Sequence, residues 1–231
     1  MLNPPAQNSR LREILKSDDC TVEIMLNDPE LPQALRTSLD ELQKFIQDDL
    51  NFQDLLDWVF ADDISKRNLE SFNKLTYNAL SIFLAQSPTI QEIVYNHQYF
   101  IPRLKAFIDP SQSENLNDPV SCGHFQYIIE HYSRFSHGLL LQELSELATF
   151  LIHNMALLSY RELFINLNSD FGQFFELTEQ NAIDLSKETN GPTGYFVATA
   201  IKMILEKNPE KFIPLFQKAE VFTILLNSAE N

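Results

Sequence analysis

Glycine is scarce in this chain, at five of 231 residues. β-Sandwiches and barrels need many tight turns, and an α/β nucleotide-binding fold needs a glycine loop after a strand, so these classes are excluded. Two cysteines, Cys20 and Cys122, are too few for a disulfide framework or a thiolate metal cage and favour a reduced, intracellular protein. No apolar run is long enough to cross a bilayer, and residues 1–10 lack the apolar stretch of a secretory signal.

Basic residues are also in short supply, with 17 Lys and Arg against 32 Asp and Glu and a formal net charge of −15. A chain without a basic stripe is poorly suited to nucleic acid or to an anionic membrane, so we expect neither as a partner. The first 60 residues hold 12 acidic and 5 basic residues. A basic protein surface would suit this region, although an acidic face that merely aids solubility is the simpler alternative.

What the sequence has in quantity is apolar residues, 44% of the chain, at the spacing of helices. They recur three and four positions apart, so that each group lines one helical face. The groups are Leu39, Leu42, Phe45 and Ile46; Phe52, Leu55, Leu56 and Val59; Leu75, Ala79, Ile82 and Phe83; Phe125, Ile128, Ile129 and Tyr132; and Val197, Ile201, Ile204 and Leu205. The pattern predicts an all-α chain of about ten to twelve helices.

Capping signals mark where these helices should begin and end. Ser38 and Glu41 have the spacing of a capping box. Four polar residues directly precede a proline, which predicts proline at the first helical position in Asp28-Pro29, Ser87-Pro88, Asp118-Pro119 and Asn208-Pro209. Gly138 suits a left-handed stop for the helix before it.

Many short helices with short connections favour stacked helical pairs over a compact bundle. A faint internal repeat, in which residues 99–108 resemble residues 211–219, points the same way. We therefore predict an irregular armadillo- or HEAT-like solenoid, with a flexible segment at residues 1–10, a single helical-repeat domain at 11–226 and a tail at 227–231.

Residues that could carry chemistry do not form a recognisable constellation. His124 and His131 are seven apart, about 10 Å along a helix, which is too far to share one ion. The carboxylate pairs Asp18-Asp19 and Asp62-Asp63 sit where helices begin or end, so capping is the simpler role. We expect no catalytic residue, no metal and no cofactor.

A helical enzyme that uses His131 or His137 as a base remains an open alternative. Ser133 lies near His131 and Ser136 precedes His137, but neither pair has a glycine elbow motif or a third orienting group. Substitution of either histidine would test this alternative in an activity screen.

The N-terminal third resembles a known family. Residues 11–26 have its short leucine helix, acidic turn and following helix, and Leu39, Leu42, Phe45 and Ile46 continue the pattern. Residues 52–59 match as far as a tryptophan followed by valine, Trp58-Val59. This order resembles the opening of the SAPS domain. The resemblance covers about residues 11–170 and continues more loosely to 226.

SAPS proteins are noncatalytic regulatory subunits of type-2A-related serine/threonine phosphatases, chiefly protein phosphatase 6. The resemblance implies a scaffold that binds the phosphatase catalytic subunit and directs it to substrates. We expect a cytoplasmic protein, with the nucleus as a second compartment. The candidate partner-binding residues are the N-terminal acids and one aromatic: Asp18, Asp19, Glu23, Asp40, Glu41 and Trp58. For Trp58 a place in the core of a phenylalanine-rich solenoid is the simpler alternative. A generic armadillo- or HEAT-like scaffold with no phosphatase link is the alternative.

Overall fold

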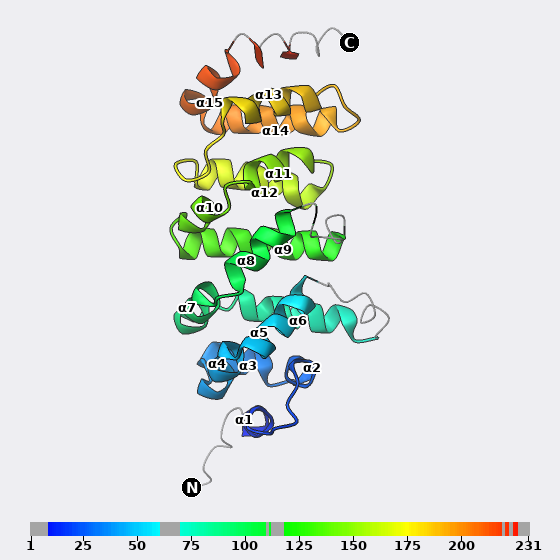
Figure 1. The fold of residues 1–231 in the computed structure, drawn as a ribbon, viewed down its shortest axis with the longest axis vertical. Helices are drawn as coiled ribbons and strands as arrows, with labels where there is room; N and C mark the ends of the chain where they lie inside the picture. Colours follow the sequence, from blue (N-terminus) through cyan, green and yellow to red (C-terminus); the bar gives the residue numbers. More distant parts are fainter. Residues whose placement is uncertain are drawn as a thin grey trace. The chain divides into compact units, whose positions relative to one another are not determined.

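A computed structural model describes residues 9–60, 70–109, 111, 118–218, 220–221 and 224–225. Within these ranges the chain is all-α with no strand, as the periodicity predicts (Figure 1). The described part has fifteen helices rather than the ten to twelve expected, because several of them are only five to seven residues long. No helix in the described part is long and apolar enough to span a membrane. The predicted segments 1–10 and 227–231 fall largely or wholly outside the described residues.

The chain divides into two compact units, residues 1–128 and 129–231. The prediction of a single domain over 11–226 stays a prediction. Helix α9 (Pro119–Phe135) contributes to both units. The first unit otherwise holds α1 (Ser9–Leu15), α2 (Val22–Asn27), α3 (Leu31–Thr37), α4 (Asp40–Gln47), α5 (Asp49–Val59), α6 (Phe72–Phe83), α7 (Pro88–Asn96) and α8 (Phe100–Ile108).

In the first unit, α4 packs against α5 and α6 packs against α7, while α5 also contacts α6 and α4 also contacts α7. The helical hairpins α4–α5 and α6–α7 therefore pack in reverse order, with the second helix of the first hairpin against the first helix of the second. Aromatic side chains fill the space between these helices and extend to the start of α9. The rings of Phe52 and Phe83 lie 5.8 Å apart, and those of Phe107 and Phe125 are stacked at 4.5 Å.

The second unit holds the remaining helices: α10 (Leu139–Glu143), α11 (Leu147–His153), α12 (Leu158–Asp170), α13 (Glu179–Glu188), α14 (Gly194–Lys207) and α15 (Pro209–Phe216). Here α11 packs against α12 and α13 against α14, and the two hairpins meet in parallel order, α11 on α13 and α12 on α14. Both units thus contain two helical hairpins, but the order in which the helices of one hairpin contact those of the other differs between the units.

Several predicted helix ends are confirmed. Ser87 caps α7, which begins at Pro88, and Asp118 accepts the Ser121 N–H at 2.9 Å where α9 begins at Pro119. Gly138 has a left-handed φ of 90° after α9. The α15 helix begins at Pro209, although the Asn208 side chain donates to the Asn168 carbonyl and leaves the helix uncapped.

Two predicted helix starts are wrong. Ser38 is the left-handed C-cap of α3, and its hydroxyl binds that of Ser87 at 2.5 Å, so Ser38 caps no helix start. Asp28 ends α2, and α3 begins only at Leu31. The Asp28 carboxylate instead accepts the Glu30 N–H and pairs with Arg10 at 3.3 Å. Other partners therefore take both side chains: Ser87, 49 residues away, binds Ser38, whereas the nearby Glu30 N–H and Arg10 bind Asp28.

The internal repeat does not correspond to equivalent helical positions. Pro102 lies in the first turn of α8, where its missing N–H costs no helical bond. Pro214 lies inside α15, which begins five residues earlier at Pro209.

Candidate functional site

The acidic residues predicted to contact a partner all lie in the first unit. Asp18 and Asp19 occupy the turn between α1 and α2, and Glu23 lies in the first turn of α2. Asp40 and Glu41 open α4, where negative charge complements the helix dipole. All except Glu41 are exposed, and their four carboxylates form no ion pair or hydrogen bond with any residue in the described ranges.

Glu41 has a different role, because it joins α1 to α4. Its carboxylate pairs with Arg12 at 3.2 Å and with Lys16 at 3.2 Å, and the side chain is 20% exposed. A backbone hydrogen bond lowers the pKa of Glu41, and the neighbouring Lys16 and Arg12 lower this pKa further. Arg12 and Lys16 therefore already neutralise the charge of Glu41 within the first unit, unlike the charges of the other four acids.

Trp58 lies in the core. Its side chain is 1% exposed, and its ring centroid is 6.3 Å from that of Phe72 at the start of α6. Helix α5 packs against α2, α4 and α6, so that it is covered on more than one side. Trp58 consequently presents no surface to a partner and serves the packing of the first unit.

Three histidines are shielded from solvent to different degrees: His124 and the side chain of His97 are buried, and His131 is half-buried. The His124 Nδ1 lies 2.6 Å from the Val59 carbonyl oxygen. Burial lowers the pKa of His124, His97 and His131, in each case as the largest effect. Neutral imidazole is thus favoured at all three positions. His137 is exposed and has a left-handed φ of 52°.

The serine hydroxyls and metal-ligating side chains considered from the sequence do not form a catalytic or metal site within the described residues. Ser136 is buried, and its hydroxyl accepts the Leu140 N–H at 3.1 Å at the start of α10. No group of three or more His, Cys, Asp or Glu side chains converges in the described part of the chain. The Asp62-Asp63 pair lies outside the described residues.

A groove of about 580 Å³ lies where α4 and the start of α5 meet α7; we call it the α4–α7 groove. Its size is in the range of ligand clefts, roughly 300–1,000 Å³. Amides and carboxylates dominate its lining, which consists of Gln43, Gln47, Asp49, Thr89, Glu92, Ile93, Asn96, His97 and Gln98. Gln43 and Gln47 are one turn apart on α4, and Thr89, Glu92 and Asn96 share a face of α7.

Part of this lining is already hydrogen-bonded and part is free. Gln98 donates to the Asp49 carboxylate at 2.7 Å, and Gln43 donates to the Ser38 carbonyl at 2.6 Å. In contrast, the side chains of Gln47, Glu92 and Asn96 make no hydrogen bond or ion pair within the described ranges. The hydrogen bond from Gln98 therefore holds Asp49 in place at the edge of the groove, and the polar side chains of Gln47, Glu92 and Asn96 beside it have no hydrogen-bond partner in the described part.

His97 forms a rigid part of the groove wall. Its ring stacks on Phe52 at 3.6 Å, nearly parallel, and its side chain is 6% exposed. The Nε2 atom lies 3.6 Å from an Asp49 oxygen, whereas the buried Nδ1 has no hydrogen-bond partner in the described part. Burial lowers the pKa of His97, and the Gln47 carbonyl and the Asp49 and Asp48 carboxylates oppose this shift.

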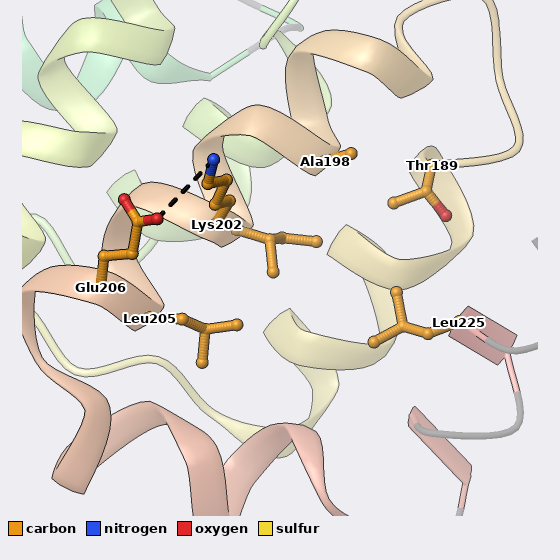
Figure 2. Close-up of a pocket in the computed structure, with 7 residues that line it drawn as sticks. Thr189, Ala198, Lys202, Leu205, Glu206 and Leu225 are labelled. Atoms are coloured by element: carbon orange, nitrogen blue, oxygen red, sulfur yellow. Dashed lines mark ion pairs between the residues drawn. The ribbon is translucent and has the colours of Figure 1, made fainter. Parts of the chain in front are cut away.

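The second unit has a different hollow, of about 380 Å³, beside α14 (Figure 2). Apolar side chains predominate in its lining: Ala198, Ile201, Leu205 and Leu225, with Thr189 at the end of α13. Lys202 and Glu206 pair at 3.7 Å along its edge. This pocket offers little to orient a polar ligand, and no described group in it marks a site.

Comparison of the chain with models of protein families, with curated proteins and with solved structures finds no match in any of the three.

Proposed function

We propose that this chain is a noncatalytic regulatory or scaffolding subunit that binds the catalytic subunit of a type-2A-related serine/threonine phosphatase, of the protein phosphatase 6 type. The similarity of residues 11–170 to the SAPS domain supports the choice of partner. The chain binds the catalytic subunit and directs it to substrates, and it makes or breaks no bond itself.

One observation carries the binding role: four carboxylates of the first unit, those of Asp18, Asp19, Glu23 and Asp40, are exposed and unpaired among the described residues. Such charges speed encounter with a basic protein surface and restrict the orientations in which it docks. Glu41 stabilises the arrangement through its ion pairs with α1. The acids thus supply steering and specificity.

We further propose that the helices stack as an irregular armadillo- or HEAT-like solenoid. The parallel order of the hairpins α11–α12 and α13–α14 supports this arrangement, because a solenoid repeats one hairpin-to-hairpin contact. The hairpins α4–α5 and α6–α7 pack in the reverse order, and this departure from a single repeated contact is why we describe the proposed solenoid as irregular. Solenoid proteins commonly bind large partners along the surface of their repeats.

Affinity purification followed by quantitative mass spectrometry tests the phosphatase link. We expect the wild-type chain to recover a phosphatase catalytic subunit and the variant D18N/D19N/E23Q/D40N to recover less of it. The matched control, E70Q/E146Q/E162Q/E210Q, removes the same charge from exposed positions elsewhere and should retain recovery. Many partners without any phosphatase catalytic subunit, or equal losses in both variants, would contradict the proposal.

A scaffold without a phosphatase link is the second candidate function, and the α4–α7 groove favours it. Amides and carboxylates make up most of the groove's lining residues, and several of them make no hydrogen bond or ion pair among the described residues, which leaves them able to bind a peptide segment.

A further inference from the structure

We propose that the α4–α7 groove binds an extended segment of a partner protein that carries lysine or arginine, with the groove amides bound to the segment's main chain. This inference rests on the proposed role of the chain in binding proteins. It does not require the partner to be a phosphatase.

The amides of the groove match the chemistry of a peptide main chain. Each amide side chain offers both N–H donors and a carbonyl acceptor, as each peptide unit does. Gln47 on α4 and Asn96 on α7 border the groove and are free of internal bonds in the described part. An extended segment between the two helices would find donors and acceptors on both sides.

The spacing of the groove residues also suits an extended segment. Residues four apart on a helix, such as Gln43 and Gln47 or Glu92 and Asn96, are separated by about 6 Å along the axis. Every second residue of an extended chain repeats at about 6.6 Å. Each helix can therefore contact alternate residues of the segment over a short length before the two repeats drift apart.

Two carboxylates define the charge that the segment must carry. Glu92 has no ion-pair or hydrogen-bond partner in the described part, and Asp49 is 52% exposed although Gln98 binds one of its oxygens. Asp48 adds a third negative charge as the N-cap of α5. No lysine or arginine lines the groove, so a cation from outside would meet no internal competitor among the lining residues.

His97 keeps this site both rigid and negative. Its stacking on Phe52 fixes the wall beside Asp49, so that this part of the groove needs no ordering on binding. Burial keeps the pKa of His97 low, and the neutral ring leaves the charge of Asp49 uncancelled near neutral pH. The side chain is over nine-tenths buried, and its Nδ1 makes no hydrogen bond within the described part.

Fluorescence anisotropy with a labelled peptide of alternating lysine and alanine, about ten residues long, tests the inference on the full-length chain. The comparison peptides replace lysine with glutamate, or keep lysine and methylate the main-chain nitrogens of the alanines. We expect the lysine peptide to bind and the glutamate peptide not to bind. Methylation should weaken binding by about fivefold or more, because it removes main-chain donors without changing charge.

Variants of the groove locate the binding site. E92Q and N96A should each weaken binding of the lysine peptide by about three- to tenfold. E162Q removes one charge from an exposed position on α12 and should leave affinity within about twofold. All three positions are exposed, so the variants should keep the wild-type circular dichroism spectrum.

The outcomes separate the groove from simple charge attraction. Equal weakening by E92Q and E162Q, unchanged binding of the methylated peptide, or no binding of the lysine peptide would each overturn the inference. Because the probe is a peptide, its binding is independent of phosphatase recovery in the purification experiment. Failure of one proposal is therefore distinguishable from failure of the other.

Discussion

The Nδ1 of His124 on α9 lies 2.6 Å from the carbonyl oxygen of Val59, the last residue of α5, 65 positions earlier in the chain. Both groups are buried. Three residues before His124, the Ser121 hydroxyl donates to the carbonyl of Phe60 at 2.6 Å. Two consecutive carbonyls at the end of α5 are thus satisfied by side chains of α9, which fixes these two helices within the first unit.

Replacement of His124 should destabilise the first unit. His124→Ala leaves the Val59 carbonyl buried without a partner and opens a cavity, and we expect a loss of about 1–3 kcal/mol in the free energy of unfolding. Urea denaturation measures this loss. His137→Asn is the control, because His137 is exposed and asparagine tolerates its left-handed backbone. Equal stability of His124→Ala and wild type would show that the bond is unimportant.

The stability of the protein should fall on mild acidification. Burial lowers the pKa of His97, His124 and His131 from the ordinary value of 6.5. The unfolded chain therefore takes up protons near pH 6.5, before the folded protein does, and this uptake favours unfolding. The stability contributed by the neutral rings is complete above that pH and is lost progressively below it.

Thermal unfolding between about pH 7.5 and about pH 5.5 measures this dependence. His124→Gln should show a smaller decrease over this range than wild type, because one of the three histidines with a lowered pKa no longer titrates. His137→Asn should follow the wild-type curve. A decrease of the same size in wild type and in His124→Gln, or no decrease in wild type, would contradict the assignment.

Gly138 cannot accept a side chain. Its φ is 90°, and a Cβ atom there would overlap the ring of Phe174. Gly138→Ala should cost about 2–4 kcal/mol, the sum of left-handed strain and overpacking. Gly191→Ala is the matched control, since a Cβ at Gly191 makes only ordinary contacts, and it should change stability by no more than about 0.5 kcal/mol. Chemical denaturation compares the two, and similar values would refute the explanation.

Trp58 should matter for stability. Trp58→Ala removes a side chain that is 1% exposed and should cost about 3–5 kcal/mol. Tyr77→Ala removes an aromatic ring that is 66% exposed and should cost at most about 0.5 kcal/mol. Calorimetric unfolding gives both values. If Trp58→Ala proved as stable as Tyr77→Ala, the core described for the first unit would be wrong.

The helices and their buried faces could be predicted from the sequence because the apolar spacing is a local property. Nearly all of the predicted face residues are buried, and Leu205 is the exception, being half-buried beside the α14 pocket. The position of Trp58 was not predictable in this way. Helix α5 packs on several sides, and its buried surface is therefore wider than one stripe.

Features that depend on distant partners escaped prediction. Ser38 has the spacing of a cap but binds Ser87, 49 residues later. The α4–α7 groove joins residues 43–49 with residues 89–98, and no local pattern indicates that these segments meet. The spacing of Gln43 and Gln47, and of Glu92 and Asn96, was visible as polar helix faces. Such faces are ordinary on solvent-exposed helices, so the spacing alone does not mark a site.

Direct mixing of the purified chain with a purified protein phosphatase 6-type catalytic subunit tests the proposed function most directly. Size-exclusion chromatography with light scattering should show a single complex of the two chains. D18N/D19N/E23Q/D40N should weaken the complex, and E70Q/E146Q/E162Q/E210Q should not. Separate elution of the two wild-type chains at every concentration would contradict the proposal that this protein is a phosphatase regulatory subunit.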